Sequence, residues 1–427
     1  MLYISKGSKP YKYIFHMKFR GNMETQKSLK EILQGYINKR PIFKNKEILS
    51  TRFTPQNIPY REEQIKQLGL ILAPFLRNEK VSNIFIYGKT GTGKTLVCKH
   101  VSSNIMDLAK HVEFKVKIIY INCKMKKVSD TEYRLLAQLI SNFGEEVPYT
   151  GLPTERLYKK FFQILDSEER NVLIILDEVD ELVKKVGDGV LYNLTRINEE
   201  LEKSKVSLIG ISNNVSFIDE LDPRVKSSLS EEEIIFPPYN ANELREILNQ
   251  RVKSAFNENC VDPAAIAKCA ALAAQEHGDA RKALDLLRVA GEIAEREGET
   301  RVLERHVNLA QSKLDMNRIS EIIKTQPKQS KAVLFSIINL HKKGIENIQT
   351  GDVYDFYTKI CSENGLTPLT QRRVSDLISE LDMFGIVNAK IISKGRYGRT
   401  RIISLNLSKK TLEEAENLLN KEFYLGF

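Results

Sequence analysis

A glycine-rich segment that follows a short apolar run carries the clearest chemical pattern in this sequence. Residues 88–95 read GKTGTGKT and fit the spacing G-x-x-x-x-G-K-T. Glycines let successive backbone N–H groups curl around phosphate oxygens, and the positive end of a following helix attracts the same anions. The Lys94 ammonium can reach the β- and γ-phosphates of a nucleotide, and the Thr95 hydroxyl can ligate Mg²⁺. The pattern therefore predicts a site for ATP or ADP with Mg²⁺. Its expected members are Gly88, Lys89, Thr90, Gly91, Thr92, Gly93, Lys94, Thr95 and Leu96.

Two acidic residues at the end of another apolar run are suited to work with this loop. Asp177 and Glu178 directly follow Val172–Leu176. If that run is a strand of the same parallel sheet, Asp177 lies beside the phosphate loop, where it can hold Mg²⁺ through water. Glu178 can then polarise a water molecule against the γ-phosphate. An acid pair alone could also be a helix cap, but its combination with the phosphate loop favours catalysis.

Other polar residues near these strands are interpreted differently. Val206–Ile211 is followed by Asn213 and Asn214, and an amide at the tip of a neighbouring strand can orient the attacking water. Asn213 is preferred over Asn214, with a turn residue as the alternative because asparagine is common in turns. Asp180 and Glu181 are expected to form a solvated first turn of a helix.

These residues need a parallel sheet to bring them together, and the hydropathy pattern from about residue 50 predicts one. Amphipathic stretches such as Thr131–Phe143 and Glu155–Leu165 separate five short runs that are apolar and mostly β-branched. The runs are Val81–Tyr87, Ile118–Asn122, Val172–Leu176, Val206–Ile211 and Ile234–Phe236. Continuous apolar strands that alternate with helices are typical of an α/β domain whose sheet is covered on both faces.

Residues 240–316 show helical patterns only and predict an all-helical domain after the sheet. The expected helices are Glu243–Val252, Ala264–Glu276, Ala280–Glu297 and Leu303–Met316. The first can be capped by Asn240 or Asn242, the second begins at Asp262-Pro263, and the third begins at Asp279.

A different pattern after Pro327 predicts a module that reads DNA. Three helices are expected at Lys328–Lys342, Thr350–Glu363 and Thr370–Phe384, with Thr350 and Thr370 as N-caps. Two strands, Ile386–Ser393 and Arg401–Leu407, follow. Helix–helix–helix–hairpin is the winged-helix plan, in which the third helix enters the major groove.

The charge of this module favours nucleic acid. From Lys390 to Arg401 there are five basic residues and no acidic one. A basic wing tip suits phosphates or the minor groove, whereas the start of the third helix suits bases and phosphates. The alternative is a protein–protein module with a solvated basic hairpin. The expected DNA-binding residues are Thr370, Gln371, Arg372, Arg373, Ser375, Lys394, Arg396, Tyr397, Arg399 and Arg401.

The composition excludes several other classes of protein. The 427 residues include 65 Lys+Arg and 55 Asp+Glu, and the net charge of +10 favours a polyanionic partner. No apolar stretch approaches the ~20 residues that span a bilayer, so no membrane role is expected. Five scattered cysteines without a C-x-x-C pair indicate a reducing compartment and argue against structural zinc. The basic first 22 residues are interpreted as a flexible leader, with a phosphate-contacting arm as the alternative.

The phosphate loop, the strand that ends in two acids, the strand that ends in asparagine and the all-helical domain together resemble the AAA+ ATPases. Several shorter strings resemble, more narrowly, the archaeal replication initiators related to the origin recognition complex and its helicase-loading partner. The strings are residues 58–64 (IPYREEQ), 221–229 (LDPRVKSSL), 236–239 (FPPY) and 278–284 (GDARKAL). The resemblance covers residues 40–408. It implies an AAA+ P-loop domain, a helical lid and a C-terminal winged helix.

The resemblance also implies roles for residues outside the phosphate loop. Arg281 would contact the γ-phosphate in cis, and Arg224 would reach the γ-phosphate of a neighbouring subunit, with Lys226 as the competing candidate. An ordinary surface arginine is the alternative for Arg224. The residues expected to flank or close over the adenine are Pro59, Tyr60, Arg61, Tyr239 and Arg251.

The expected function is that of a weak ATPase that acts as a switch and initiates DNA replication. The implied partners are duplex origin DNA, other initiator subunits and a replicative helicase of the minichromosome-maintenance type, in a cytoplasmic, nucleoid-associated protein. A branch-migration motor and an ATP-gated DNA-binding regulator are the alternatives.

The sequence divides into five expected segments. They are a leader with the N-terminal segment (1–45), the nucleotide-binding domain (46–238) with a helical insertion at about 124–165, the lid (239–325), the winged helix (326–408) and a helical tail (409–427). In initiators the insertion touches DNA, which Lys124, Lys126, Lys127 and Arg134 would permit here.

Overall fold

The computed structural model describes residues 40–50, 53–112, 114–124, 130–148, 151–345, 347–393 and 399–424. The leader of residues 1–22, Lys126 and Lys127 of the insertion, and Lys394, Arg396 and Tyr397 of the wing tip lie outside these residues. No helix in the described part of the chain is long and apolar enough to cross a membrane.

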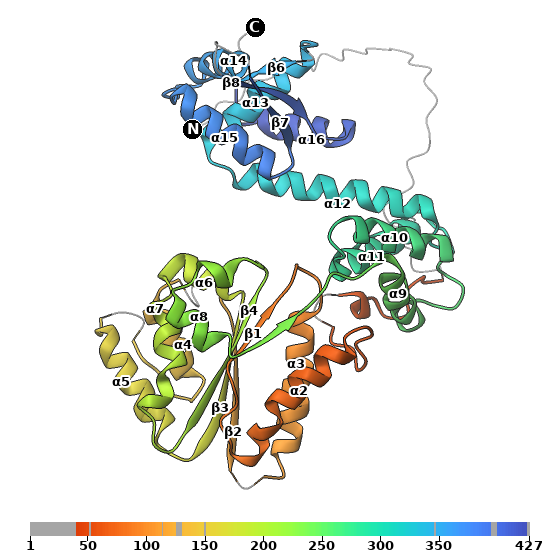
Figure 1. Ribbon diagram of the computed structural model, residues 1–427. Coiled ribbons are helices and arrows are strands. Elements are labelled where there is room, and N and C mark those ends of the chain that lie inside the picture. Colours follow the sequence, from red (N-terminus) through yellow and green to blue (C-terminus); the bar gives the residue numbers. More distant parts are fainter. Residues whose placement is uncertain are drawn as a thin grey trace, which may run out of the picture. The chain divides into compact units, whose positions relative to one another are not determined.

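A five-stranded parallel sheet forms the first part of the described chain (Figure 1). Its strands stand in the order β2-β3-β4-β1-β5. They are β1 (Ile84–Tyr87), β2 (Lys115–Asn122), β3 (Arg170–Asp177), β4 (Lys205–Ser212) and β5 (Glu232–Ile235). All five predicted strands are present, with bounds that differ by a few residues. Because β4 lies between β1 and β3, the residues that follow these three strands emerge side by side at the carboxyl edge of the sheet, where α/β proteins bind ligands.

Helices cover both faces of this sheet, which explains why its strands are apolar throughout. One core cluster joins alternate strand residues such as Ile84, Ile86 and Ile175 to the helices α2 and α3. The other joins Phe85, Ile174 and Leu176 to the helices on the opposite face. The helices are α2 (Glu62–Leu72), α3 (Lys94–Ala109), α4 (Glu132–Ser141), α5 (Thr154–Leu165), α6 (Val179–Val186), α7 (Gly189–Thr195) and α8 (Pro223–Leu229).

Four helices with their own core follow the sheet. They are α9 (Ala241–Ala255), α10 (Pro263–Gln275), α11 (Ala280–Glu297) and α12 (Glu304–Thr325). Asn240 caps α9 in a capping box with Glu243, and the Asp262 and Asp279 side chains accept backbone N–H groups at the starts of α10 and α11. These caps are the predicted ones, with Asn240 rather than Asn242 at α9.

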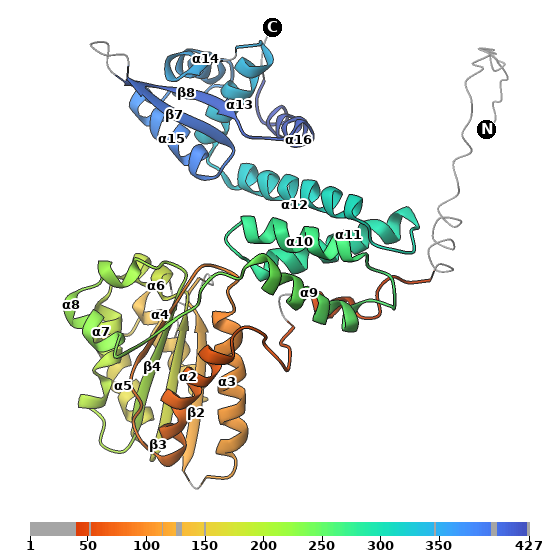
Figure 2. The ribbon, with the colours of Figure 1, turned by 45° about the vertical axis from the view of Figure 1, so that its right-hand side comes forward.

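The last part of the chain is a helical module with a three-stranded sheet (Figure 2). Its elements are α13 (Lys328–Lys342), β6 (Ile348–Gln349), α14 (Thr350–Glu363), α15 (Gln371–Met383), β7 (Val387–Ser393), β8 (Arg399–Leu405) and α16 (Lys409–Leu419). The β7–β8 hairpin is antiparallel, and β6 pairs with β8. Three helices and a hairpin give the predicted winged helix.

Three local predictions differ from the structure. The fourth lid helix was expected to end at Met316 but continues to Thr325, because Ile319, Ile322 and Ile323 pack against the core of the winged helix. Thr350 is the first residue of α14 and not its N-cap. The cap is Gln349, whose N–H donates to the Asp352 carboxylate at 2.8 Å. The strand β6 was not predicted, since two residues show no periodicity.

Candidate functional site

The phosphate loop requires glycine at two places because its neighbours approach closely. Gly91 has a φ of +71°, and a Cβ there would lie 1.8 Å from Asp279 Oδ1. A Cβ at Gly88 would lie 2.3 Å from the carbonyl oxygen of Phe236. The Ala280 N–H donates to the Gly91 carbonyl at 3.3 Å. The loop is therefore packed between the residues that follow β5 and the first turn of α11, so the sheet and the lid meet at it.

Lys94 is held at the centre of the loop. Its ammonium, which is buried, donates to the carbonyls of Gly88 and Lys89 at 2.7 Å each and to Asn213 Oδ1 at 2.9 Å. Burial lowers the pKa of Lys94 to about 8, and the Arg281 charge acts in the same direction, while Asp177 opposes it. Asn213, which follows β4, is thus brought to the phosphate loop as its position after a central strand predicted.

Thr95 and Asp177 also meet. Thr95 Oγ1 donates to Asp177 Oδ2 at 2.8 Å, and the Tyr120 hydroxyl donates to the same oxygen at 2.6 Å. The Glu178 N–H donates to the other carboxylate oxygen, Asp177 Oδ1, at 3.0 Å. A hydroxyl and a carboxylate at hydrogen-bonding distance are hard oxygen donors that suit Mg²⁺ held partly through water and phosphate. The residues present therefore fit this metal.

Glu178 occupies a strained position next to that pair. Its φ of +56° lies in the left-handed region, which is unusual for a residue other than glycine and is common at functional sites. Oε2 lies 3.7 Å from Lys124 Nζ and makes no hydrogen bond within the described residues. Burial raises the pKa of Glu178, and the nearby Asp177 and Asp180 add to this, while Lys124 opposes it.

The predicted solvated first turn of the following helix is wrong for Asp180. Its side chain is only 5% exposed, and Oδ1 has no hydrogen-bond partner within the described residues. Val179 and Leu182 are buried as well, because α6 lies directly against the edge of the sheet. Glu181 is partly exposed and pairs with Lys184 at 2.8 Å, as expected for a surface turn. No signal in the sequence distinguishes these two acids. The face of α6 on which each one lies decides which is buried, and that depends on how α6 packs.

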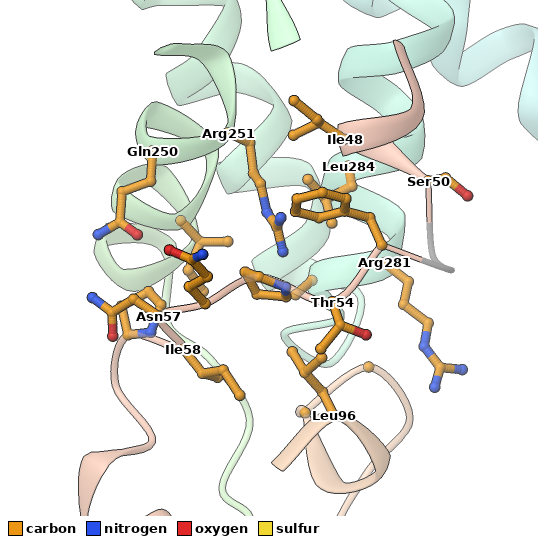
Figure 3. A pocket seen from close by; sticks show the side chains of 18 of the residues that line it. Ile48, Ser50, Thr54, Asn57, Ile58, Leu96, Gln250, Arg251, Arg281 and Leu284 are labelled. Carbon is orange, nitrogen blue, oxygen red and sulfur yellow. The ribbon is translucent and has the colours of Figure 1, made fainter. Parts of the chain in front are cut away.

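A cavity of about 830 Å³ adjoins the loop. Three parts of the chain line this cavity. They are the segment before α2, which contributes Pro59, the phosphate loop, which contributes Leu96, and the lid, which contributes Tyr239. Figure 3 shows Arg251 and Arg281 reaching toward it from the helices of the lid.

Seven of the predicted nucleotide-binding residues therefore line one space, together with the γ-phosphate candidate Arg281. They are Pro59, Gly91, Gly93, Thr95, Leu96, Tyr239 and Arg251. Burial lowers the pKa of Arg251, whose guanidinium lies 4.8 Å from the centre of the Phe53 ring.

Tyr60 and Arg61 are placed differently. Neither belongs to the residues that line the cavity. Tyr60 is 41% exposed, whereas the Arg61 side chain is buried against the main chain of the phosphate loop.

Arg224 and Lys226 lie on the surface of α8 and outside the cavity. Arg224 Nε is 3.1 Å from Asp222 Oδ1, and its guanidinium lies 5.4 Å from the centre of the Tyr192 ring. Lys226 pairs with Asp219 at 2.7 Å. The structure does not bring either residue to the phosphate loop of its own chain.

The winged helix has a separate hollow between the third helix and the hairpin. Gln371, Arg372 and Ser375 of α15 line it together with Arg401 of β8. Arg401 Nη1 donates to the Ser375 carbonyl at 2.5 Å and so ties the hairpin to α15.

Two more of the predicted DNA-binding residues, Thr370 and Arg373, lie outside the lining of this hollow. Thr370 caps α15, and Arg373 lies 3.6 Å from Glu380 and 3.8 Å from Asp376. Arg399 begins β8.

Comparisons with known families match three parts of the chain. Residues 77–218 match the AAA domain, residues 245–312 match the Cdc6 AAA+ ATPase-type lid domain, and residues 321–415 match the CDC6 C-terminal winged helix domain. The fold and the site thus define an AAA+ ATPase that carries a winged helix.

Similarity to individual proteins extends over almost the whole chain. An ORC1-type DNA replication protein of Thermococcus onnurineus is 54% identical over 384 residues, 89% of this chain and 92% of the relative. ORC1-type DNA replication protein 1 of Methanosarcina mazei is 51% identical over 400 residues, 93% of this chain and 95% of the relative. The solved structure of the Aeropyrum pernix ORC1 protein in complex with DNA is 44% identical, with a TM-score of 0.80 over 90% of this chain and 98% of that one. The chain belongs to the family of ORC1-type DNA replication proteins.

Proposed function

We propose that this chain binds duplex origin DNA under the control of ATP, initiates replication there and helps to recruit the replicative helicase. The observation that carries the proposal is the connection between the two sites. The lid that borders the nucleotide cavity ends in α12, and only Gln326 and Pro327 separate α12 from α13, the first helix of the winged helix. A change in the angle of the lid would therefore move the winged helix.

The nucleotide site is proposed to bind ATP as follows. The main chain of the phosphate loop cradles the phosphates, and Lys94 contacts the β- and γ-phosphates. Thr95 and Asp177 would hold Mg²⁺, which neutralises phosphate charge when bound. Arg281 would contact the γ-phosphate from the lid. Pro59, Tyr239 and Arg251 would surround the base and the ribose.

Hydrolysis is proposed to be slow and to act as a switch. Glu178 takes a proton from the attacking water, which Asn213 orients. Arg224, or Lys226 in its place, would have to come from a neighbouring subunit, because in this chain both lie outside the cavity. Turnover by a single subunit would therefore lack the cation that stabilises the charge on the transferred phosphoryl group.

DNA binding is proposed to use the winged helix and the inserted helices α4 and α5. The start of α15, with Gln371, Arg372 and Ser375, would enter the major groove, and Arg401 with the basic turn of the hairpin would contact phosphates. Support comes from the Aeropyrum pernix ORC1 protein, which was solved in complex with DNA and is 44% identical. Recruitment of a minichromosome-maintenance helicase rests on the family resemblance.

Footprinting on the origin region of the host chromosome tests this function. The full chain with ATP should protect discrete sites, and Arg372→Ala should reduce that protection. Arg373→Ala is the matched control, since Arg373 is engaged by two acids of its own helix and should matter less. Uniform protection along the fragment at all concentrations would contradict origin recognition.

A further inference from the structure

Arg61 is the most deeply buried arginine or lysine among the described residues, at 2% exposure. It stands immediately before α2, on the segment that leads from the nucleotide cavity into the sheet domain. The guanidinium makes no ion pair with an acidic side chain in the described part of the chain. Its charge must therefore be offset by dipoles, and burial lowers the pKa of Arg61 accordingly.

The partners of this guanidinium are three carbonyl groups. Nε donates to Thr92 at 2.8 Å, Nη1 to Tyr60 at 2.7 Å and Nη2 to Pro237 at 2.6 Å. The guanidinium also lies over the Tyr239 ring, with its carbon 3.7 Å from the ring centre. Only a planar group with donors in fixed directions satisfies these four contacts together, so lysine could not replace it.

Each of these contacts reaches a different functional segment. Thr92 belongs to the phosphate loop, Tyr60 to the segment that lines the cavity through Pro59, Pro237 to the connection after β5, and Tyr239 to the entrance of the lid.

On the lid side, Gly278 and Tyr239 also approach each other closely. A Cβ at Gly278, just before α11, would lie 2.4 Å from the Tyr239 carbonyl oxygen. Movement of the Tyr239 backbone is therefore passed directly to the helix that carries Arg281.

The bond to Thr92 has an electrostatic consequence. The Thr92 carbonyl and the Gly93 N–H belong to one peptide group, and a cation on the carbonyl strengthens that N–H as a donor. If a phosphate accepts a hydrogen bond from the Gly93 N–H and displaces this peptide group, the Thr92 carbonyl moves relative to Arg61. A displacement of the loop is thereby transmitted to Pro237 and Tyr239.

We infer that Arg61 is a positioning residue that couples the phosphate loop to the lid without touching the nucleotide. The inference rests on the proposed nucleotide site. In this arrangement the difference between bound ATP and bound ADP becomes a difference in lid angle. Loss of the three directed hydrogen bonds would leave a folded protein whose lid no longer follows the nucleotide.

Distance measurement between two spin labels tests the inference on the full chain. Labels at Leu70→Cys in α2 and Ala271→Cys in α10 report the position of the lid relative to the sheet domain, because both residues are exposed. The five native cysteines are all buried, which favours selective labelling. The labelled chain, otherwise unchanged, should show different distance distributions at saturating ATP and at saturating ADP. The Arg61→Lys variant should show the same distribution with ATP as with ADP. It should also bind ATP about tenfold more weakly, as expected for the loss of a coupling between two parts of a protein.

The control is Arg77→Lys, at an exposed arginine between α2 and β1, which should behave like the unchanged chain. If Arg61→Lys does not fold, Tyr239→Leu removes the ring beneath the guanidinium and keeps the three carbonyls, and at saturating nucleotide it should also lose the distance change. An Arg61→Lys or Tyr239→Leu variant that keeps the full change would overturn the inference. So would an unchanged chain that binds ATP without any change of distance, whereas an unchanged chain that binds no ATP would contradict the proposed function itself.

Discussion

At the scale of single residues, burial shifts an acid and a base of the site toward their neutral forms. The pKa of Lys94 falls from its ordinary value of 10.5 to about 8 in the loop. Burial raises the pKa of Glu178, so that this carboxylate is a stronger proton acceptor than a solvated one. Burial is the largest cause of both shifts, and shifted pKa values of this kind are common at functional sites.

The affinity for ATP should fall as the pH rises through about 8. A base with a lowered pKa is charged below that value and neutral above it, and a polyphosphate is held by the charged form. With a pKa of about 8, binding should weaken up to about tenfold between pH 7 and pH 9. Isothermal titration calorimetry measures this. Lys94→Arg, which stays charged, should bind less well but without the pH dependence, and a flat profile for the unchanged chain would contradict the assignment.

Glu178→Gln should slow ATP hydrolysis by a factor of about 10²–10⁴ and leave ATP affinity unchanged, since general-base catalysis contributes on that order. In the unchanged chain, turnover should fall as the pH is lowered through the raised pKa of Glu178, because the protonated acid cannot accept a proton. The variant should lack this acid limb. Equal turnover by both proteins would exclude Glu178 as the base.

At the same scale, the motif spacing was sufficient to predict which residues meet, since Lys94, Thr95, Asp177 and Asn213 all stand at or beside the ends of identifiable elements. It could not predict that Asp180 is buried or that Arg61 lies beneath the loop. Both depend on how one element is packed against another, and neither residue differs in type from the exposed acids and bases beside it in the sequence.

At the scale of elements, apolar runs and caps predicted the strands, the lid helices and the winged helix to within a few residues. For α12 and β6, where the prediction failed, a contact distant in the sequence was responsible. The second half of α12 is helical because its isoleucines pack against the winged helix. The two residues of β6 form a strand because they pair with β8.

Two glycine substitutions should have opposite effects on stability. Gly278→Ala places a side chain at a φ of +67° and 2.4 Å from the Tyr239 carbonyl oxygen, so it should lower the free energy of unfolding by about 1–3 kcal/mol. Gly69→Ala, inside α2 with open space around it, should raise it by about 0.5–1 kcal/mol. The chain has no tryptophan, so urea unfolding is best followed by circular dichroism. A Gly278→Ala variant as stable as the unchanged chain would contradict the close approach of Gly278 to the Tyr239 carbonyl oxygen.

At the scale of the whole molecule, the described chain between Pro41 and Phe427 forms one compact unit that contains the sheet, the lid and the winged helix. The proposed mechanism needs this continuity. In that mechanism, nucleotide contacts at the phosphate loop would reach the lid through the close approach of Gly91 and Asp279, and α12 continues from the lid to the winged helix. A domain joined by a long flexible linker could not transmit a change of lid angle.

The most direct test of this account is DNA binding measured by fluorescence anisotropy, with ATP and with ADP, on origin-derived and random duplexes across a salt series. The account predicts selective binding of the origin duplex, an affinity that differs between the two nucleotides, a steep loss of affinity with salt, and only weak turnover. Equal binding of both duplexes, independent of the nucleotide and accompanied by vigorous DNA-stimulated hydrolysis, would contradict it and favour a motor.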